Sequence, residues 1–211
     1  MSSYRSLQPI FKQHPMCYNS VMNQAIEKIY PALEEALRAG SSTVVAIDGP
    51  CASGKTTLAE TLQKRYDGRV IPLDDFFLPQ TLRTEERYAT PGGNVHYERF
   101  LEEIAPFLHP DQIGKPLLYL PFDCKTMSFR PRRRIPWAPL TIVEGSYALH
   151  EALRHLYDIR IFLTIDPEEQ ERRILSREGR EGLMVFQERW IPLENLYFTS
   201  VHPEQFCDFV L

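Results

Sequence analysis

Short apolar runs rich in β-branched residues alternate along the chain with segments whose apolar residues recur at helical spacing. The apolar runs predict strands at 43–48, 69–73, 140–143, 159–165 and 207–211. The helical spacing predicts helices at 21–40, 55–66, 97–108, 147–156 and 168–177. Because the strands are continuous apolar runs, we expect a mostly parallel sheet with helices on both faces, an α/β fold. The stretch 79–95, rich in Pro, Gly and charge, predicts an exposed loop.

One short motif lies between the first strand and the next helix. Residues 49–56 read Gly-Pro-Cys-Ala-Ser-Gly-Lys-Thr and fit the phosphate-binding pattern G-x-x-x-x-G-K-[ST]. In the order strand, loop, helix, backbone N–H groups and a helix N-terminus converge on a polyphosphate. We expect Lys55 to reach the β- and γ-phosphates and the Thr56 hydroxyl to ligate Mg²⁺. The residues expected to bind ATP are Gly49, Pro50, Cys51, Ala52, Ser53, Gly54, Lys55, Thr56 and Thr57.

Acidic residues follow the predicted strands, at the edge where open parallel sheets bind ligands. Asp74 comes directly after the second strand, and we interpret it as the base that receives the proton of an acceptor hydroxyl. Its neighbour Asp75 would point to the opposite face of an extended chain. Glu144 ends the third strand, in the place of the acid that holds Mg²⁺ through water in many P-loop proteins. Asp166 precedes Pro167 and is better explained as a helix N-cap.

Arginines form two groups that bear on phosphate chemistry. Arg173 and Arg177 are four residues apart and share one helix face. We interpret them as part of a lid over 168–190 that clamps the transferring phosphoryl group, as opposed to a solvated face paired with glutamates. The cluster 130–134 between two prolines predicts a loop or strand edge, and a phosphate-facing role for one of its arginines is left open.

Composition narrows the classes of function. The chain has 211 residues, enough for one well-packed domain, and a formal net charge of −4, which argues against a nucleic-acid-binding protein. Its four cysteines are far apart and form neither a disulfide framework nor a zinc site. No apolar run reaches the ~20 residues of a membrane span, so we expect a cytoplasmic protein without membrane contact. The sequence is compatible with a monomer and with a homo-oligomer.

With these motifs the chain resembles the uridine kinase group, which also includes nicotinamide riboside kinases and phosphoribulokinases. The resemblance covers residues 43–182 and is carried by the phosphate loop, Leu73-Asp74-Asp75-Phe76-Phe77, Val143-Glu144-Gly145-Ser146-Tyr147 and Arg172-Arg173-Ile174. It implies that residues 1–211 form a single three-layer P-loop kinase domain, with an N-terminal extension and helix at 1–40 and a small helical lid. It also implies transfer from Mg-ATP to a primary hydroxyl of a small molecule, with Asp74 as base and Glu144 near Mg²⁺.

The acceptor side matches that group less closely. Its uridine kinases carry a Tyr-Asp pair followed by a His and an Arg, whereas here Phe122-Asp123 is followed by Met127 and Phe129, with Arg130 as a substitute. We expect a nucleoside-like acceptor in an aromatic pocket that reads hydroxyl groups. The expected substrate-binding residues are Asp75, Phe77, Tyr88, His96, Phe122, Asp123 and Arg130.

Three other functions also use a phosphate loop of this kind. A GTPase would need a guanine-reading Asn-Lys-x-Asp, which the sequence lacks. A nucleoside monophosphate kinase would need further arginines, which Arg83, Arg87 and Arg99 could supply. A nucleotide-binding regulatory protein would not need a base such as Asp74. We therefore predict an ATP-dependent kinase of a nucleoside-like small molecule, with uridine or a related nucleoside as the leading acceptor. The alternatives are a kinase of a non-nucleoside small molecule or of a nucleoside monophosphate, and a non-catalytic nucleotide-binding regulatory protein.

Overall fold

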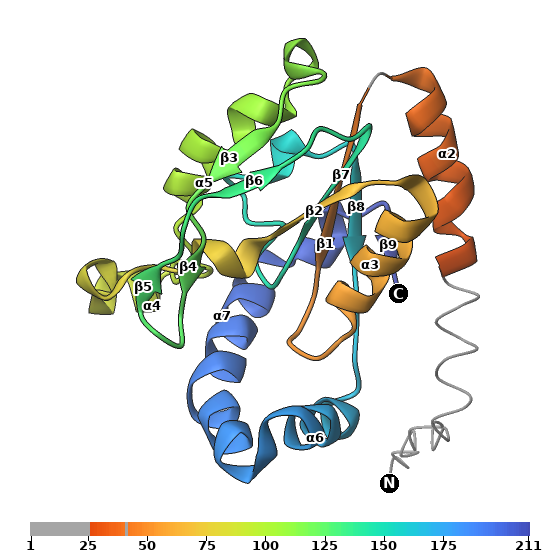
Figure 1. Ribbon diagram of the computed structural model, residues 1–211. Coiled ribbons are helices and arrows are strands. Elements are labelled where there is room, and N and C mark those ends of the chain that lie inside the picture. Colours follow the sequence, from red (N-terminus) through yellow and green to blue (C-terminus); the bar gives the residue numbers. More distant parts are fainter. Residues whose placement is uncertain (1–25, 41) are drawn as a thin grey trace, which may run out of the picture.

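A five-stranded parallel sheet forms the centre of the molecule (Figure 1). The computed structural model describes residues 26–40 and 42–211. The strands are β1 (Thr43–Asp48), β2 (Arg69–Pro72), β7 (Leu140–Glu144), β8 (Ile159–Phe162) and β9 (Phe209–Val210), in the order β2-β7-β1-β8-β9. All neighbours in this sheet pair in parallel. The expected α/β sandwich with a parallel sheet is confirmed.

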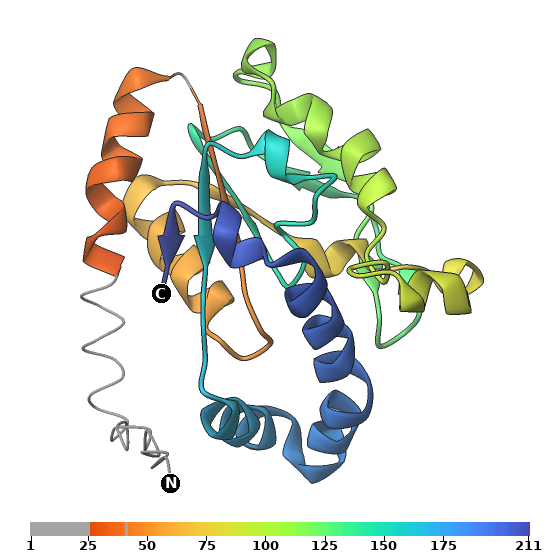
Figure 2. The same cartoon turned by 180° about the vertical axis from the view of Figure 1, so that it is seen from behind.

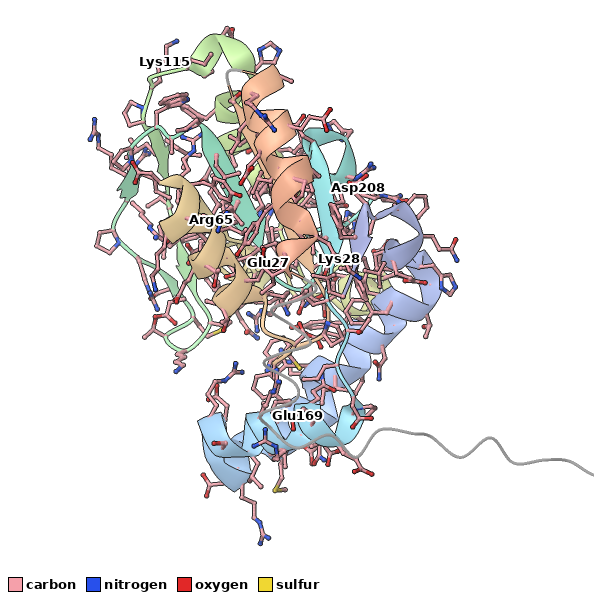
Figure 3. The ribbon with its side chains drawn as sticks, turned by 90° about the vertical axis from the view of Figure 1, so that its right-hand side faces the viewer. Glu27, Lys28, Arg65, Lys115, Glu169 and Asp208 are labelled. Atoms are coloured by element: carbon pink, nitrogen blue, oxygen red, sulfur yellow. The ribbon has the colours of Figure 1, made fainter. Side chains whose placement is uncertain are left out.

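Alternate residues of β1 point to the two faces of the sheet. Val45 and Ile47 pack under α2 (Ile29–Ala39) and α3 (Lys55–Tyr66), which lie together on one face (Figure 1). The two helices are also joined through Arg65, whose guanidinium stacks 3.9 Å from the centre of the Tyr30 ring. Figure 3 shows Arg65 on α3 beside α2.

The opposite face carries the larger part of the core. Val44 and Ala46 contribute to it from β1, and α5 (Tyr97–Glu103) and α7 (Ile191–Val201) supply Phe100 and Tyr197. Two small antiparallel hairpins lie on this side: β3 (Leu117–Tyr119) with β6 (Arg133–Ile135), and β4 (Phe122–Asp123) with β5 (Ser128–Phe129). Short helical turns cover Leu73–Phe76, Gln80–Leu82, Ala105–Leu108, Pro110–Gln112, Arg154–Leu156 and Pro203–Phe206.

An arm of two helices extends beyond the sheet. It consists of α6 (Pro167–Val185), a π-helical turn (Phe186–Trp190) and α7, and both ribbon views show α6 beneath the loop that joins β1 to α3 (Figures 1 and 2). Asp166 caps α6 by accepting the N–H groups of Glu168 and Glu169, as expected of an N-cap. Gly179 has φ 74° and interrupts the helical path of α6. This break lies in the segment that the sequence predicts as part of a lid.

Two predicted segments have a different structure. The helix expected at 147–156 is a series of tight turns ending in Arg154–Leu156. Tyr147 has φ 76°, which is incompatible with a helix, and Asp48 accepts the N–H groups of Tyr147 and Leu149. Asp48 thus accepts two N–H groups of this turn, while those of Ala148 and His150 donate to the carbonyl groups of Gly145 and Tyr147.

The stretch 79–95 is not a simple exposed loop. It contains α4 (Glu85–Ala89), and Gly92 and Gly93 are buried. Arg87 holds the end of the segment by donating to the carbonyl groups of Gly93 and Val95, each at 2.7 Å. Arg87 thus holds in place a segment whose Pro- and Gly-rich composition predicts an exposed loop.

Helix boundaries differ from expectation at prolines. The helix predicted over 97–108 ends at Glu103 and continues as the turn Ala105–Leu108, because Pro106 has no N–H to continue the ladder. The predicted helix 21–40 is observed as α2, which starts at Ile29, so Pro31 lies in its first turn. The part of this prediction at 21–25 lies outside the described residues. Within the described residues, no helix is both long enough and apolar enough to cross a membrane.

Candidate active site

A cavity of about 810 Å³ opens at the carboxyl ends of β1, β2 and β7. Parallel sheets bind ligands at this edge, so the position is the one expected from the topology. Most of the wall comes from the phosphate loop, from residues just after β2 and β7, and from the α6–α7 arm. The residues of these segments that line it are Cys51, Ala52, Gly54, Lys55, Thr56, Thr57, Asp74, Phe77, Glu144, Gly145, Ser146, Tyr147, Arg173, Arg177, Glu178, Val185, Phe186, Arg189, Trp190 and Glu194. Cys124 and Lys125 complete the wall from the β4–β5 hairpin.

The phosphate loop has the backbone form of an anion-binding turn. Gly49 has φ 138°, and a Cβ there would lie 2.3 Å from the Leu163 carbonyl oxygen, so only glycine fits. Gly54 has φ 106° and precedes α3 without any side chain capping the helix. The first N–H groups of α3 therefore point toward the cavity with no helical partner, which suits a phosphate.

Lys55 lies inside this loop. Its side chain is 8% exposed, and its Nζ donates to the carbonyl oxygens of Gly49 and Pro50, each at 2.8 Å, and to Ser146 Oγ at 3.3 Å. The ammonium group is thus held at the cavity wall, where an incoming phosphate can replace carbonyl partners with a stronger charge-assisted bond.

Asp48 braces the loop from beneath. It is fully buried and accepts the N–H groups of Gly49, Tyr147 and Leu149 and the Tyr197 hydroxyl, at 2.6 to 3.0 Å. Burial raises its pKa to about 6, and these donors together with Lys55 oppose the rise. One carboxylate thus joins the phosphate loop, the turn after β7 and helix α7. The sequence placed Asp48 at a strand end but did not distinguish this structural role.

Two oxygen-bearing side chains lie where a magnesium ion is expected. The Thr56 hydroxyl is 3.2 Å from Glu144 Oε2, and both residues line the cavity. Burial, and then the nearby charge of Asp74, raise the pKa of Glu144 to about 7. A divalent cation would relieve this concentration of negative charge, and hard oxygen ligands are what Mg²⁺ prefers. The residues present fit the ion, and the assignment of Thr56 and Glu144 stays a prediction.

Asp74 and Asp75 diverge, as their adjacency predicts. Asp74 lies in the cavity wall, and desolvation there raises its pKa, against the charge of Lys55. Asp75 turns away, accepting the Tyr119 hydroxyl at 2.5 Å and lying 3.6 Å from the Arg133 guanidinium. A Cβ on Gly145 would lie 2.9 Å from the Leu73 Cβ, so glycine lets the turn after β7 approach the Asp74 segment.

The two arginines predicted for a lid both line the cavity. Arg173 donates to the Ala52 carbonyl oxygen at 3.0 Å and to Glu169 at 2.7 Å, so it already contacts the phosphate loop. Arg177 is exposed and donates to Glu178 at 2.8 Å. Glu169, which pairs with Arg173, lies on α6 in Figure 3, at the end of the molecule opposite Lys115. The arginines therefore both face the cavity and pair with glutamates, which combines the two sequence interpretations.

The predicted acceptor-binding residues are only partly brought together. Phe77 lines the cavity, with its ring centre 5.8 Å from that of Trp190. The other six, Asp75, Tyr88, His96, Phe122, Asp123 and Arg130, do not line it. His96 caps α5, Phe122 packs on Phe129, and Asp123 accepts the Arg130 guanidinium at 2.6 Å. Tyr88 accepts a hydrogen bond from Arg189. Their role in binding substrate stays a prediction.

Several lining residues were missed by sequence reasoning. Glu194 and Trp190 come from the α6–α7 arm, and Lys125 comes from the hairpin. The sequence segment 194–198 copies part of a protease site used in expression tags, and we interpret that as coincidence because Thr199 follows. In the structure Glu194 and Tyr197 are buried. An isolated carboxylate on an otherwise apolar segment is the signal that could have identified Glu194.

Comparisons with known proteins agree with this geometry. The chain is 28% identical over 177 residues to the uridine kinase of Staphylococcus epidermidis, a match covering 79% of this chain and 82% of that protein. It is 27% identical over 127 residues to uridine-cytidine kinase C of Dictyostelium discoideum, which covers 59% of this chain but only 27% of that longer protein. No family model matches the chain.

The fold is also found among solved structures. A possible uridine kinase from Bacillus stearothermophilus superposes with a TM-score of 0.68 at 18% identity, covering 90% of this chain and 98% of that one. At this identity the likeness concerns the fold. The chain thus resembles uridine kinases in sequence and shares its fold with this possible uridine kinase.

Proposed function

We propose that the chain transfers the γ-phosphoryl group of Mg-ATP to a hydroxyl group of a nucleoside-like acceptor. The observation that carries this proposal is that Lys55, Asp74 and the Thr56–Glu144 pair line one cavity at the carboxyl edge of the sheet. A protein that only binds Mg-nucleotide needs a carboxylate such as Glu144 for the metal, but it does not need a second one such as Asp74. The sequence relatives named as uridine kinases support the choice of acceptor class.

The residues supply what phosphoryl transfer requires. The N-terminus of α3 and Lys55 would hold the phosphates, and Arg173 and Arg177 would stabilise charge on the transferring group. When bound through Thr56 and Glu144, Mg²⁺ would neutralise phosphate charge. The acceptor oxygen attacks the γ-phosphorus, its proton passes to Asp74, and the bond from phosphorus to the β-phosphate oxygen breaks to release ADP.

The raised pKa of Asp74 suits its proposed role. Desolvation makes the carboxylate a stronger base than a solvent-exposed aspartate, while Lys55 acts in the opposite direction and limits the rise. A base near the acceptor needs this compromise, because it must be ionised before transfer and must accept a proton during it.

A nucleoside monophosphate is a weaker candidate acceptor than the sequence suggests. Arg83 donates to the Leu78 carbonyl, Arg87 is paired with Glu98, and Arg99 donates to the carbonyl groups of Leu120 and Asp75. These three arginines are committed to structure. Lys125 and Arg189 do line the cavity, so an acceptor with an anionic group is retained as the second candidate.

The test is ADP release from Mg-ATP across a panel of acceptors. The panel includes nucleosides, nicotinamide riboside, pantothenate and nucleoside monophosphates. We expect turnover with a nucleoside, uridine first. Turnover only with an anionic acceptor would favour the second candidate, and ATP binding without turnover on any acceptor would contradict the proposal.

A further inference from the structure

Glu194 is a buried carboxylate next to the phosphate loop that the proposed reaction leaves without a role. It lies in the first turn of α7, is 5% exposed and lines the cavity. Buried carboxylates are costly unless their oxygens accept strong hydrogen bonds. Glu194 meets this condition with partners that belong to the catalytic cavity, rather than with partners in the core.

Both carboxylate oxygens of Glu194 are bonded to cavity residues. Oε2 accepts the Cys51 N–H of the phosphate loop at 2.9 Å, and Oε1 accepts the Ser146 hydroxyl at 2.6 Å. Ser146 Oγ is in turn 3.3 Å from Lys55 Nζ. A single side chain from α7 therefore reaches the loop backbone directly and reaches the loop lysine through one serine.

The other helix of the arm holds the same loop residue. Gln170 on α6 is 8% exposed and donates from Nε2 to the Cys51 carbonyl oxygen at 3.0 Å. The N–H of Cys51 is thus bound by α7 and its C=O by α6. The arm between these contacts carries Arg173, Arg177 and Trp190, and it contains the break at Gly179.

We propose that Glu194 is a positioning residue that couples the phosphate loop to the α6–α7 arm. By holding Cys51 and Ser146, it transmits the position of the loop to the arm that bears Arg177 and Trp190. The inference rests on the proposed function only in requiring that the loop binds a nucleotide. It assigns Glu194 no contact with the transferring group.

Two substitutions distinguish the effect of the Glu194 charge from the effect of its hydrogen bonds. In Glu194→Gln the amide oxygen can accept the Cys51 N–H, and the amide nitrogen can donate to Ser146 Oγ. Ser146 can then donate to the Gly49 carbonyl oxygen, which lies 3.2 Å away. Glu194→Ala removes both bonds. The pair of variants therefore tests the bridge itself, with the glutamine form as matched control.

Trp190 provides a readout that does not depend on turnover. The chain has two tryptophans, so Trp137→Phe leaves Trp190, which lies in the arm, as the only tryptophan of the protein. Mg-ADP is titrated into this protein and into its Glu194→Gln and Glu194→Ala forms, and the Trp190 emission is recorded. Binding is followed in parallel by calorimetry.

We expect Mg-ADP to change Trp190 emission in the parent and in Glu194→Gln. Glu194→Ala should still bind Mg-ADP, but its Trp190 emission should change much less. In assays of the full reaction, kcat should fall about a hundredfold in Glu194→Ala and less than about threefold in Glu194→Gln, because misplacing a catalytic group by about 1 Å has an effect of that size. The ATP KM should change less than kcat. Should the alanine variant not fold, Glu194→Leu gives the same test.

Three outcomes overturn the inference, and one of them also overturns the proposed function. An undiminished Trp190 response and unchanged kcat in Glu194→Ala would show that the bridge does not couple loop and arm. A parent protein that binds no Mg-ADP would contradict the proposed function and the inference together, whereas bound Mg-ADP with no Trp190 response in the parent would contradict the inference alone.

Discussion

The two ends of the cavity are built in different ways. At the phosphate end, Lys55 is 8% exposed and donates to two loop carbonyl groups, and the fully buried Asp48 accepts four hydrogen bonds beneath the loop. At the proposed acceptor end, Lys125 and Arg189 are exposed. One end is fixed by buried hydrogen bonds, and the other is formed by long side chains at the surface.

This difference matches the demands of the proposed reaction. Phosphates are the same in every ATP-dependent kinase, so their site gains from being fixed before the nucleotide binds. Acceptors differ, and the proposed acceptor end is formed by exposed side chains of the β4–β5 hairpin and of the arm, which take no part in the buried contacts of Glu194 and Gln170 with the loop. The phosphate end should therefore be sensitive to single substitutions, and the acceptor end tolerant of them.

The largest effect is expected from Lys55→Ala. Removing the ammonium group takes away a charge that binds both ground-state phosphates and the transferring group, so kcat/KM should fall about a thousandfold and ATP binding should weaken. Lys64→Ala is the matched control, because Lys64 lies on the same helix with its side chain 80% exposed. Steady-state kinetics and ATP titration measure both. Equal activity of the two variants would remove Lys55 from the site.

A large loss of stability is expected from Asp48→Asn. The amide nitrogen cannot accept the Leu149 N–H, and a buried donor without a partner costs about 1 to 3 kcal/mol. Urea unfolding measures this loss. The control is Asp208→Asn, which changes the exposed ion pair of Asp208 with Arg160. Asp208 is labelled in Figure 3, and we expect its substitution to lower the free energy of unfolding by less than about 1 kcal/mol. Similar losses in both variants would contradict the brace assigned to Asp48.

An intermediate effect concerns pH. Glu144 must be ionised to hold Mg²⁺, and burial with the nearby charge of Asp74 raises its pKa to about 7. Activity at low Mg²⁺ should therefore rise as the pH increases through about 7. High Mg²⁺ should move this rise to lower pH, because the metal binds only the ionised form. A profile that does not respond to Mg²⁺ concentration would argue against Glu144 as the titrating group.

The smallest effect is expected at the acceptor end, from Lys125→Ala. For a neutral nucleoside we expect the acceptor KM to change less than about twofold, because an isolated exposed charge contributes little. An anionic acceptor should lose about fivefold in affinity. Lys115→Ala, at the opposite end of the molecule from Glu169 in Figure 3, is the control. A large rise of KM for a neutral acceptor would mean that the acceptor end is as fixed as the phosphate end.

The phosphate end could be predicted almost completely from the sequence. The strand 43–48, the loop and the helix 55–66 occur at the expected bounds, because hydrophobic period, glycine positions and the lysine all lie within 24 consecutive residues. Asp74 and Asp75 also diverge as predicted, although they lie in the helical turn Leu73–Phe76 and not on an extended chain. Local patterns specify local structure, and this part of the site is local.

The long-range contacts of the site and its acceptor end could not be predicted in the same way. Glu194 meets Cys51 across 143 positions of sequence, and no local pattern encodes that contact. His96 and Asp123 have the residue types of a substrate site, yet the structure uses them to cap a helix and to pair with Arg130. At 147–149, two of the hydrogen bonds that hold the turn come from Asp48, which is far away in sequence.

The central claim is that Asp74 acts in transfer while the loop binds the nucleotide, and one comparison tests it most directly. Mg-ATP affinity and turnover should be measured on the same preparation of Asp74→Asn. The account predicts an ATP dissociation constant within about threefold of the parent protein and a loss of kcat of about a thousandfold, as expected when a positioned base is removed. Near-normal turnover, or loss of ATP binding equal to the loss of turnover, would contradict it.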